Sequence, residues 1–285
     1  MARSTDISPL SQVLARADAI ADGARLPDTI ATGFPSVDRI LGGGLRGGDL
    51  VVLGGDVGSG KSALALAIAM RVSQRRSPVA FFSGEMSTDR LLERALAIEG
   101  RVRVDDLRAG VVNDIARASV GAAAVRLRDV LPHFDVIPTE GLRGITECVE
   151  STRPELVVVD SLQSLLRGER STDEELAESV RRLKTFAIQQ KVAMVVTAQL
   201  PQLPQLAARD DRRPQLDDFG ALGAVKHHAD VVLALFREDM YDRRREIEGA
   251  TELLVRKNRN GNTGYVDLYF YAQWMRFEDM LDPDR

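Results

Sequence analysis

The sequence predicts an α/β protein with a mainly parallel sheet, helices on both faces of that sheet and an antiparallel hairpin at its C-terminal edge. Short, fully apolar segments such as 156–159 and 231–236 alternate with helical patterns, which is typical of strands buried on both faces of a parallel sheet. Near the C-terminus, two strand-like segments, 251–257 and 265–271, flank the sequence NRNGN at 258–262, which is typical of a hairpin turn.

Length and composition limit the possible functions. The 285 residues suit one large domain with an appendage. The 38 Lys and Arg residues and 42 Asp and Glu residues give a net charge of −4, so any contact with nucleic acid depends on local loops rather than on overall charge. The single cysteine, Cys148, excludes an internal disulfide and a cysteine-cluster zinc site.

The chain shows no signal for a membrane or for export. No apolar run reaches the ~18 residues that cross a bilayer, and the first ten residues lack the apolar core of a signal peptide. A cytoplasmic protein without a membrane partner is therefore expected. The adjacent His227 and His228 do not have the spacing of a helical metal-ligand pair.

Residues 1–30 are expected to form an N-terminal segment with an amphipathic helix, and residues 31–285 the main domain. Ser8 and Pro9 suit an N-cap and a first helical position, and Gly23 ends the segment. Apolar residues then recur at helical spacing: Leu10, Val13, Leu14, Ala17, Ile20 and Ala21. This helix packs either on its own domain or on a neighbouring subunit, and sequence position alone leaves both alternatives open.

The main domain reads as alternating strands and helices. Strands are expected at 50–53, 79–82, 136–138, 156–159, 192–197 and 231–236, and helices at 62–72, 88–99, 114–129 and 173–190. Ser87 precedes the second of these helices and is a suitable N-cap.

A phosphate-binding loop follows the first of these strands. Its pattern G-x-x-x-x-G-K-S is formed by Gly55, Asp56, Val57, Gly58, Ser59, Gly60, Lys61 and Ser62. A strand before the pattern and a helix after it are the context that the motif requires. Backbone amides and the helix N-terminus attract phosphate, Lys61 reaches the β- and γ-phosphates, and the Ser62 hydroxyl ligates Mg²⁺. ATP and Mg²⁺ are therefore the expected ligands.

Two carboxylates end neighbouring strands. Asp160 follows the apolar segment 156–159, where it can hold the Mg²⁺ shell beside the phosphate loop. Glu85 follows the segment 79–82, where a carboxylate can polarise the water that attacks the γ-phosphate. The alternative for Glu85 is an acid that stabilises the N-terminus of the next helix.

Several ordered segments resemble the motor domain of DnaB-type replicative helicases, which are hexameric RecA-like ATPases. They are TGFPSVD at 32–38, GGGLRGGDL at 42–50, FFSGEMS at 81–87, VVDSLQ at 158–163, Gln199, KNRNG at 257–261 and QWMRF at 273–277. The resemblance implies a RecA-like P-loop NTPase fold, with the N-terminal helix docked on the adjacent subunit. The family's primase-interacting domain is absent from the expected organisation.

The resemblance also assigns roles to residues. It implies that Glu85 is the catalytic base and that Gln199 senses the γ-phosphate and relays its state to DNA. Lys257 and Arg259 match the family's paired basic finger, and residues two apart on a strand share a face. Their target is then ATP on the neighbouring subunit, where they neutralise charge during phosphoryl transfer. An exposed basic hairpin tip is the alternative.

Two arginine-containing loops are candidates for contact with single-stranded DNA. Segment 166–171 carries Arg167 and Arg170, and segment 201–220, expected to lack regular structure, carries Arg209, Arg212 and Arg213. The alternative is solvated arginines, partly offset by Asp210 and Asp211. The family's second pore loop has an arginine–glutamate pair where this chain has Gly220 and Ala221, so Gly220 and Gly223 are expected to contact phosphate through their backbone amides.

Three functions follow from these observations. The first is an ATP-dependent ring-forming motor that translocates on single-stranded DNA and unwinds duplex, in a homo-oligomer expected to be hexameric, with other replication proteins as further partners. The second is a RecA-like repair or recombination ATPase. The third is a helicase-partner or loader ATPase that does not unwind DNA itself.

Overall fold

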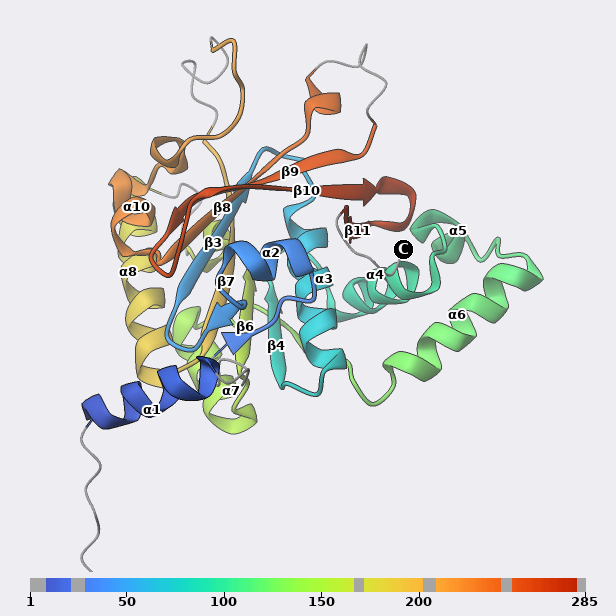
Figure 1. Ribbon diagram of the computed structural model, residues 1–285. Helices are drawn as coiled ribbons and strands as arrows, with labels where there is room; N and C mark the ends of the chain where they lie inside the picture. Colours follow the sequence, from blue (N-terminus) through green and yellow to red (C-terminus); the bar gives the residue numbers. More distant parts are fainter. Residues whose placement is uncertain (1–8, 22–28, 167–171, 202–208, 242–247, 281–285) are drawn as a thin grey trace, which may run out of the picture.

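A nine-stranded sheet forms the centre of the molecule (Figure 1), in a computed structural model that describes residues 9–21, 29–166, 172–201, 209–241 and 248–280. The strand order is β11-β10-β9-β8-β3-β7-β6-β4-β5, and β1 and β2 form a separate antiparallel pair. In chain order the strands are β1 (Thr29–Ile30), β2 (Leu45–Arg46), β3 (Leu50–Gly55), β4 (Val79–Ser83), β5 (His133–Val136), β6 (Leu156–Asp160), β7 (Ala193–Gln199), β8 (Val231–Phe236), β9 (Ala250–Asn258), β10 (Gly264–Tyr271) and β11 (Arg276–Asp279).

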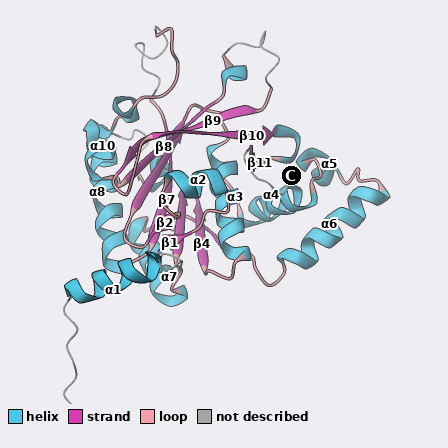
Figure 2. Ribbon diagram, viewed as in Figure 1, coloured by secondary structure: helices cyan, strands magenta, loops and turns pink. Residues whose placement is uncertain are grey.

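Helices cover both faces of this sheet (Figure 2). The α-helices are α1 (Pro9–Ala21), α2 (Pro35–Ile40), α3 (Lys61–Gln74), α4 (Thr88–Gly100), α5 (Val104–Ala109), α6 (Asp114–Leu127), α7 (Leu142–Thr152), α8 (Asp173–Gln190) and α10 (Ala224–His228). The 3-10 helices are η1 (Leu162–Leu165), η2 (Leu216–Phe219), η3 (Ala221–Gly223), η4 (Glu238–Met240) and η5 (Ala272–Trp274).

The strand directions confirm the predicted fold class. Strands β8, β3, β7, β6, β4 and β5 are parallel to one another. Strands β9, β10 and β11 continue the sheet in antiparallel fashion, so the C-terminal edge holds one strand more than the expected hairpin.

The sheet separates two hydrophobic cores. On one face, α3 packs against β3, β4, β6 and β7, and its side chains Leu64, Leu66 and Ile68 are buried. On the other face, α8 packs against β3 and β7 and contributes Val180 and Leu183. The parallel strands are buried on both sides, which explains why they are continuous apolar runs in the sequence.

The carboxyl ends of the central parallel strands meet at one edge of the sheet. Gly55 at the end of β3 pairs in register with Gln199 at the end of β7. Ser83 at the end of β4 pairs with Asp160 at the end of β6. Side chains at or just after these four strand ends are therefore neighbours, and ligands of open α/β sheets bind at this edge.

Some elements differ from those expected. Strand β5 occupies 133–136 rather than 136–138, and α7 was not predicted. Helix α7 begins after Gly141 without a side-chain cap, so the usual start signal is missing. The segment expected to be irregular contains η2, because Gln215 and Asp218 form a capping box and Phe219 is buried.

Helix α1 confirms a helix near the N-terminus, while its docking stays a prediction. Its described apolar side chains are exposed: Leu10 by 68%, Val13 by 51% and Leu14 by 57%. The division of the chain at residue 30 also stays a prediction. In the part of the chain that the structure describes, no helix has both the length and the apolar character needed to cross a membrane.

Candidate nucleotide-binding site

The phosphate loop joins β3 to α3 and wraps around the Lys61 ammonium. Lys61 Nζ donates hydrogen bonds to the carbonyl oxygens of Gly55 (3.0 Å) and Asp56 (2.8 Å). Gly60 caps α3 with φ +102, and a Cβ there would lie 2.9 Å from Phe277 Cζ, so both conformation and space require glycine. Burial lowers the pKa of Lys61, and the charges of Asp160, Asp56 and Glu85 oppose that shift.

Asp160 lies beside the loop with one oxygen paired and the other free. Its Oδ1 accepts hydrogen bonds from Ser62 Oγ (3.0 Å) and Thr197 Oγ1. Its Oδ2 is buried and has no hydrogen-bond partner among the described residues. A buried carboxylate oxygen without a donor is unfavourable unless a cation approaches it. Asp160 and Ser62 thus fit a Mg²⁺ ion, whose preferred ligands are oxygens.

Glu85 and Gln199 line the same cavity of about 400 Å³ as Lys61, Ser62 and Asp160. Glu85 reaches it because the Gly84 amide donates to the Asp160 carbonyl (2.7 Å), which ties the segment after β4 to the end of β6. Gln199 is held through its backbone by Gln163: Gln163 Nε2 donates to the Gln199 carbonyl (3.1 Å), and the Gln199 amide donates to Gln163 Oε1 (3.2 Å).

Sequence reasoning missed four residues near this site. Gln163 positions Gln199, and Tyr241 donates from its hydroxyl to Asp56 Oδ2 (3.1 Å) in the phosphate loop; burial and Asp56 raise the pKa of Tyr241 to about 12. Arg94 and Arg237 also line the cavity. A signal existed for Arg94, because it falls one turn after the buried Leu91 and one turn before the buried Ile98 on α4.

Lys257 and Arg259 lie at the opposite end of the sheet from the phosphate loop of their own chain. Val232 pairs with Lys257, whereas Leu235 pairs with Gly55. Three residues along β8 separate these positions, which is about 10 Å along a strand. The structure does bring the two basic side chains together: both donate to the carbonyl oxygen of His227.

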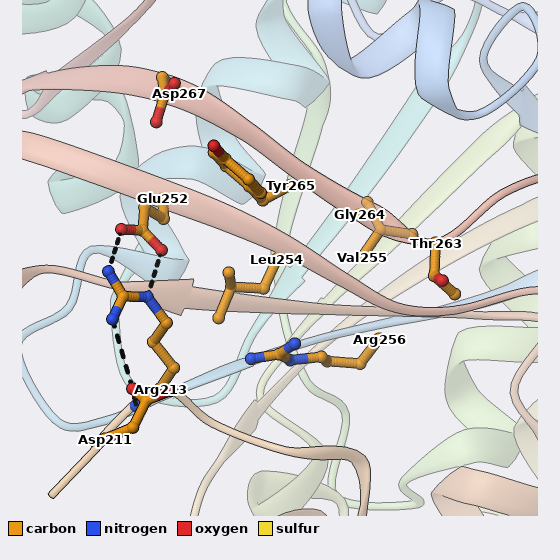
Figure 3. A pocket seen from close by; sticks show the side chains of 10 residues that line it. All are labelled: Asp211, Arg213, Glu252, Leu254, Val255, Arg256, Thr263, Gly264, Tyr265 and Asp267. Atoms are coloured by element: carbon orange, nitrogen blue, oxygen red, sulfur yellow. Dashed lines mark hydrogen bonds and ion pairs between the residues drawn. The ribbon is translucent and has the colours of Figure 1, made fainter.

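The three candidate DNA-binding arginines in the described part of segment 201–220 already have partners. Arg209 forms an ion pair with Asp218. The Arg213 guanidinium binds both oxygens of Glu252, at 2.5 and 2.7 Å, in a second cavity of about 650 Å³ on the β9–β10 hairpin (Figure 3). Arg212 lies over the Tyr241 ring, 5.3 Å from its centroid.

The remaining candidate contacts with DNA are only partly described. Arg167 and Arg170 lie outside the described residues. Gly220 precedes η3 and Gly223 is its last residue, with φ +63 and +77, and between them Leu222 is 64% exposed. The larger cavity on the hairpin holds paired charges but no phosphate loop, so the smaller cavity is the better nucleotide site.

The fold and this loop define a class of protein. A phosphate loop between a parallel strand and a helix, with an acid at the end of a nearby strand, is typical of P-loop nucleotide-binding proteins. Residues 29–279 match the family model described as the DnaB-like helicase C terminal domain. The chain belongs to this family, and the resemblance seen in its sequence motifs is confirmed.

Curated relatives include the replicative DNA helicase DnaC of Bacillus subtilis (strain 168), which is 30% identical over 259 residues. The replicative DNA helicase DnaB of Leifsonia xyli subsp. xyli (strain CTCB07) is 31% identical over 258 residues. Each alignment covers 88% of this chain and 56% of the relative. The chain thus spans about half the length of the curated relatives it matches.

Solved structures show the same fold. One of them, the structure of an isolated ATPase domain, has a TM-score of 0.86 at 24% identity, covering 96% of this chain and 99% of that one. A DnaB-like replicative helicase studied with primase has a TM-score of 0.83 at 23% identity, covering 97% of this chain and 67% of that one. These similarities confirm the RecA-like fold.

Proposed function

We propose that the chain is an ATP-driven motor that assembles into a ring, translocates on single-stranded DNA and unwinds duplex. The observation that carries this proposal is the cavity in which Lys61, Ser62, Glu85, Asp160 and Gln199 converge. Family membership and relatives named as replicative helicases support it.

In this proposal, each residue of the cavity has a chemical task. The loop amides and Lys61 bind the phosphates of ATP. Ser62 and Asp160 would hold Mg²⁺, which would supply positive charge to the phosphate oxygens. Glu85 accepts a proton from the attacking water, and Gln199 contacts the γ-phosphate at the end of β7.

The position of Lys257 and Arg259 supports a role in trans. The strand position of Lys257 lies about 10 Å along β8 from that of the phosphate loop, and both basic side chains bind residues 226–230, before the start of β8. In a ring, this end of the hairpin faces the nucleotide of the next subunit. An arginine supplies a planar, permanently charged set of donors for phosphate oxygens.

Ring assembly uses α1. Its exposed apolar residues docked on a neighbouring copy would be removed from water, which is favourable. The α5–α6 arm offers a matching surface, since Val111, Ile115 and Val125 are exposed by 73%, 80% and 68%. Figure 1 shows α6 reaching away from the sheet.

Native mass spectrometry, with and without an ATP analogue and single-stranded DNA, tests the proposal alongside ATPase and unwinding assays. A closed ring with DNA-stimulated hydrolysis and unwinding is the expected result. A filament would instead favour a RecA-like repair or recombination ATPase. Hydrolysis without unwinding, in rings formed only with a full-length helicase, would favour a partner or loader.

A further inference from the structure

Asp230 is a buried carboxylate outside the nucleotide cavity, just before β8. It is 4% exposed, and its Oδ2 accepts hydrogen bonds from the Leu50 amide (2.8 Å) and Lys184 Nζ (2.5 Å). Its Oδ1 accepts one from Arg259 Nη1 (3.2 Å). A buried charge is tolerated only with such partners, so this carboxylate fixes three separate elements against one another.

Lys257 and Arg259, here called the basic pair, form hydrogen bonds with the segment that ends in Asp230. Lys257 Nζ donates to the carbonyl oxygens of Lys226 (2.6 Å) and His227 (3.4 Å). Arg259 Nη2 donates to the His227 carbonyl (2.9 Å), and the Arg259 amide donates to the Asp230 carbonyl (2.9 Å). These acceptors, together with the Asp230 carboxylate, form a cradle within residues 226–230 for both cations.

The hydrogen bonds of the cradle use only part of the Arg259 guanidinium. A guanidinium has five N–H donors, and the structure gives two of its nitrogens a partner, Nη1 with Asp230 and Nη2 with His227. The side chain is 51% exposed. These two contacts hold the guanidinium, and its exposure leaves other N–H groups available to a phosphate outside this chain.

The same segment begins at a candidate DNA-binding loop. Residues 220–223 lead directly into α10, and Gly223 caps this helix with φ +77. Lys226 Nζ also pairs with Asp217 Oδ1 (2.6 Å) in η2. Only Ala224 and Val225, the first two residues of α10, lie between the loop and the cradle, so we expect a movement of one to displace the other.

We propose that Asp230 and the last turn of α10 are the positioning residues of the basic pair, and that they make hydrolysis on the neighbouring subunit depend on the conformation of loop 220–223. This inference rests on the proposed function, because it requires that Lys257 and Arg259 act in trans.

The first test is Asp230→Asn in mixed rings, with ATP binding and turnover measured. ATP binding should stay near wild type, while turnover falls by about 10²-fold, the scale of a misplaced catalytic group. Mixing with Lys61→Ala subunits should restore activity, because such interfaces join an intact loop to an intact basic pair. Mixing with Arg259→Ala should restore nothing, because both variants lack a positioned pair.

The opposite pattern, recovery with Arg259→Ala but not with Lys61→Ala, would place the defect in the variant's own phosphate loop through Leu50 and overturn the inference. Wild-type turnover in Asp230→Asn would also overturn it. A reference mixture of Lys61→Ala and Arg259→Ala tests the trans action of the basic pair separately from its positioning by Asp230. No recovery there, in rings shown to be mixed, would instead overturn the trans action in the proposed function and this inference with it.

If Asp230→Asn does not fold, Asp230→Glu replaces it, since it keeps the charge for Lys184 and moves the carboxylate by one methylene. The same mixing pattern is expected.

A second test addresses the link to the loop. Lys226→Gly and Lys226→Ala both remove the pair with Asp217, but glycine also loosens the helix. Stimulation of ATPase activity by single-stranded DNA should fall several-fold further in the glycine variant. Equal stimulation in both variants would overturn the coupling through α10.

Discussion

Glu85 and Asp160 follow or end neighbouring strands, and their surroundings separate their tasks. Asp160 is 3% exposed and accepts hydrogen bonds from Ser62 and Thr197, which suits a fixed metal ligand. Glu85 is exposed to the cavity, where a carboxylate can exchange a proton with water. The two acids look alike in the sequence, and their different environments support the different tasks proposed for them.

Glu85→Gln should retain ATP but slow its hydrolysis by ~10² or more, because the amide cannot accept the proton of the attacking water. Nucleotide binding by fluorescence titration and turnover by phosphate release measure the two effects. Glu93→Gln is the matched control, because this acid lies on α4 in an exposed pair with Arg108. Wild-type turnover in Glu85→Gln would show that Glu85 is not the base.

His228 should lose its proton more readily than an ordinary histidine. Burial lowers its pKa below the ordinary 6.5, and the charges of Arg181, Lys257 and Arg259 lower it further. The unfolded chain then binds the proton more tightly, so protonation of His228 destabilises the fold as pH falls below 6.5, and the effect vanishes above it. NMR titration should give a pKa below 6.5, which rises in Arg181→Gln; a value at or above 6.5 in the wild type would contradict the assignment.

At the scale of elements, helix α1 and segment 209–220 are the two parts of the molecule with proposed binding roles. Helix α1 exposes Leu10, Val13 and Leu14, and segment 209–220 lies along the hairpin through the Arg213–Glu252 pair (Figure 3). The sequence offers no reason to distinguish the arginines of this segment, whereas in the structure each of them contacts a different partner. Arg213 is fixed to the protein, while Arg212 packs on Tyr241 without an ion pair among the described residues.

Removal of residues 1–28 should leave a folded domain that does not form rings, because the hydrophobic contacts between subunits are lost. Leu14→Glu should weaken assembly in the same way. The matched control is Ala15→Glu, which should leave assembly intact, because helical spacing places Ala15 on the side of α1 opposite to its apolar residues. Size-exclusion chromatography with light scattering measures the assembly. Intact rings without residues 1–28 would contradict docking by α1.

Arg212→Ala and Arg213→Ala should differ in effect. If Arg212 contacts DNA phosphate, its loss weakens binding at all sequences and reduces the salt slope by about 1. Loss of Arg213 leaves Glu252 unpaired and should lower the free energy of unfolding by about 1 to 2 kcal/mol. Binding isotherms at several salt concentrations and urea unfolding measure these effects. An unchanged slope in Arg212→Ala would place the DNA contacts elsewhere.

For the molecule as a whole, the two ends of the sheet carry complementary parts of one proposed site. The phosphate loop lies at the carboxyl ends of the parallel strands, and the basic pair lies at the other end beside Asp230. In the proposed ring, adjacent copies would bring these two parts to the same ATP.

Arg259→Ala should bind ATP almost normally, hydrolyse it poorly and inhibit wild-type subunits in mixed rings. Each variant subunit leaves a neighbour's nucleotide without its cation, so activity should fall in proportion to the interfaces affected. ATPase titration with increasing variant, with mixed rings verified by mass, measures this. Mixing Arg259→Ala with Lys61→Ala subunits separates action in trans from action in cis, because only action in trans lets an intact Arg259 serve a neighbour's intact phosphate loop; no recovery in rings verified as mixed would show that Arg259 acts within its own chain.

The strand–helix alternation, the phosphate loop, the acids that follow the strands and the basic pair can all be predicted from the sequence, because these patterns are local. Buried parallel strands require continuous apolar runs, and a phosphate loop requires glycine and lysine at fixed spacing. The three-dimensional structure was needed to show that Gln163 holds Gln199, that Tyr241 reaches Asp56 and that Asp230 supports Arg259. Such contacts join residues that are 29 or more positions apart, and no local pattern encodes the packing that brings them together.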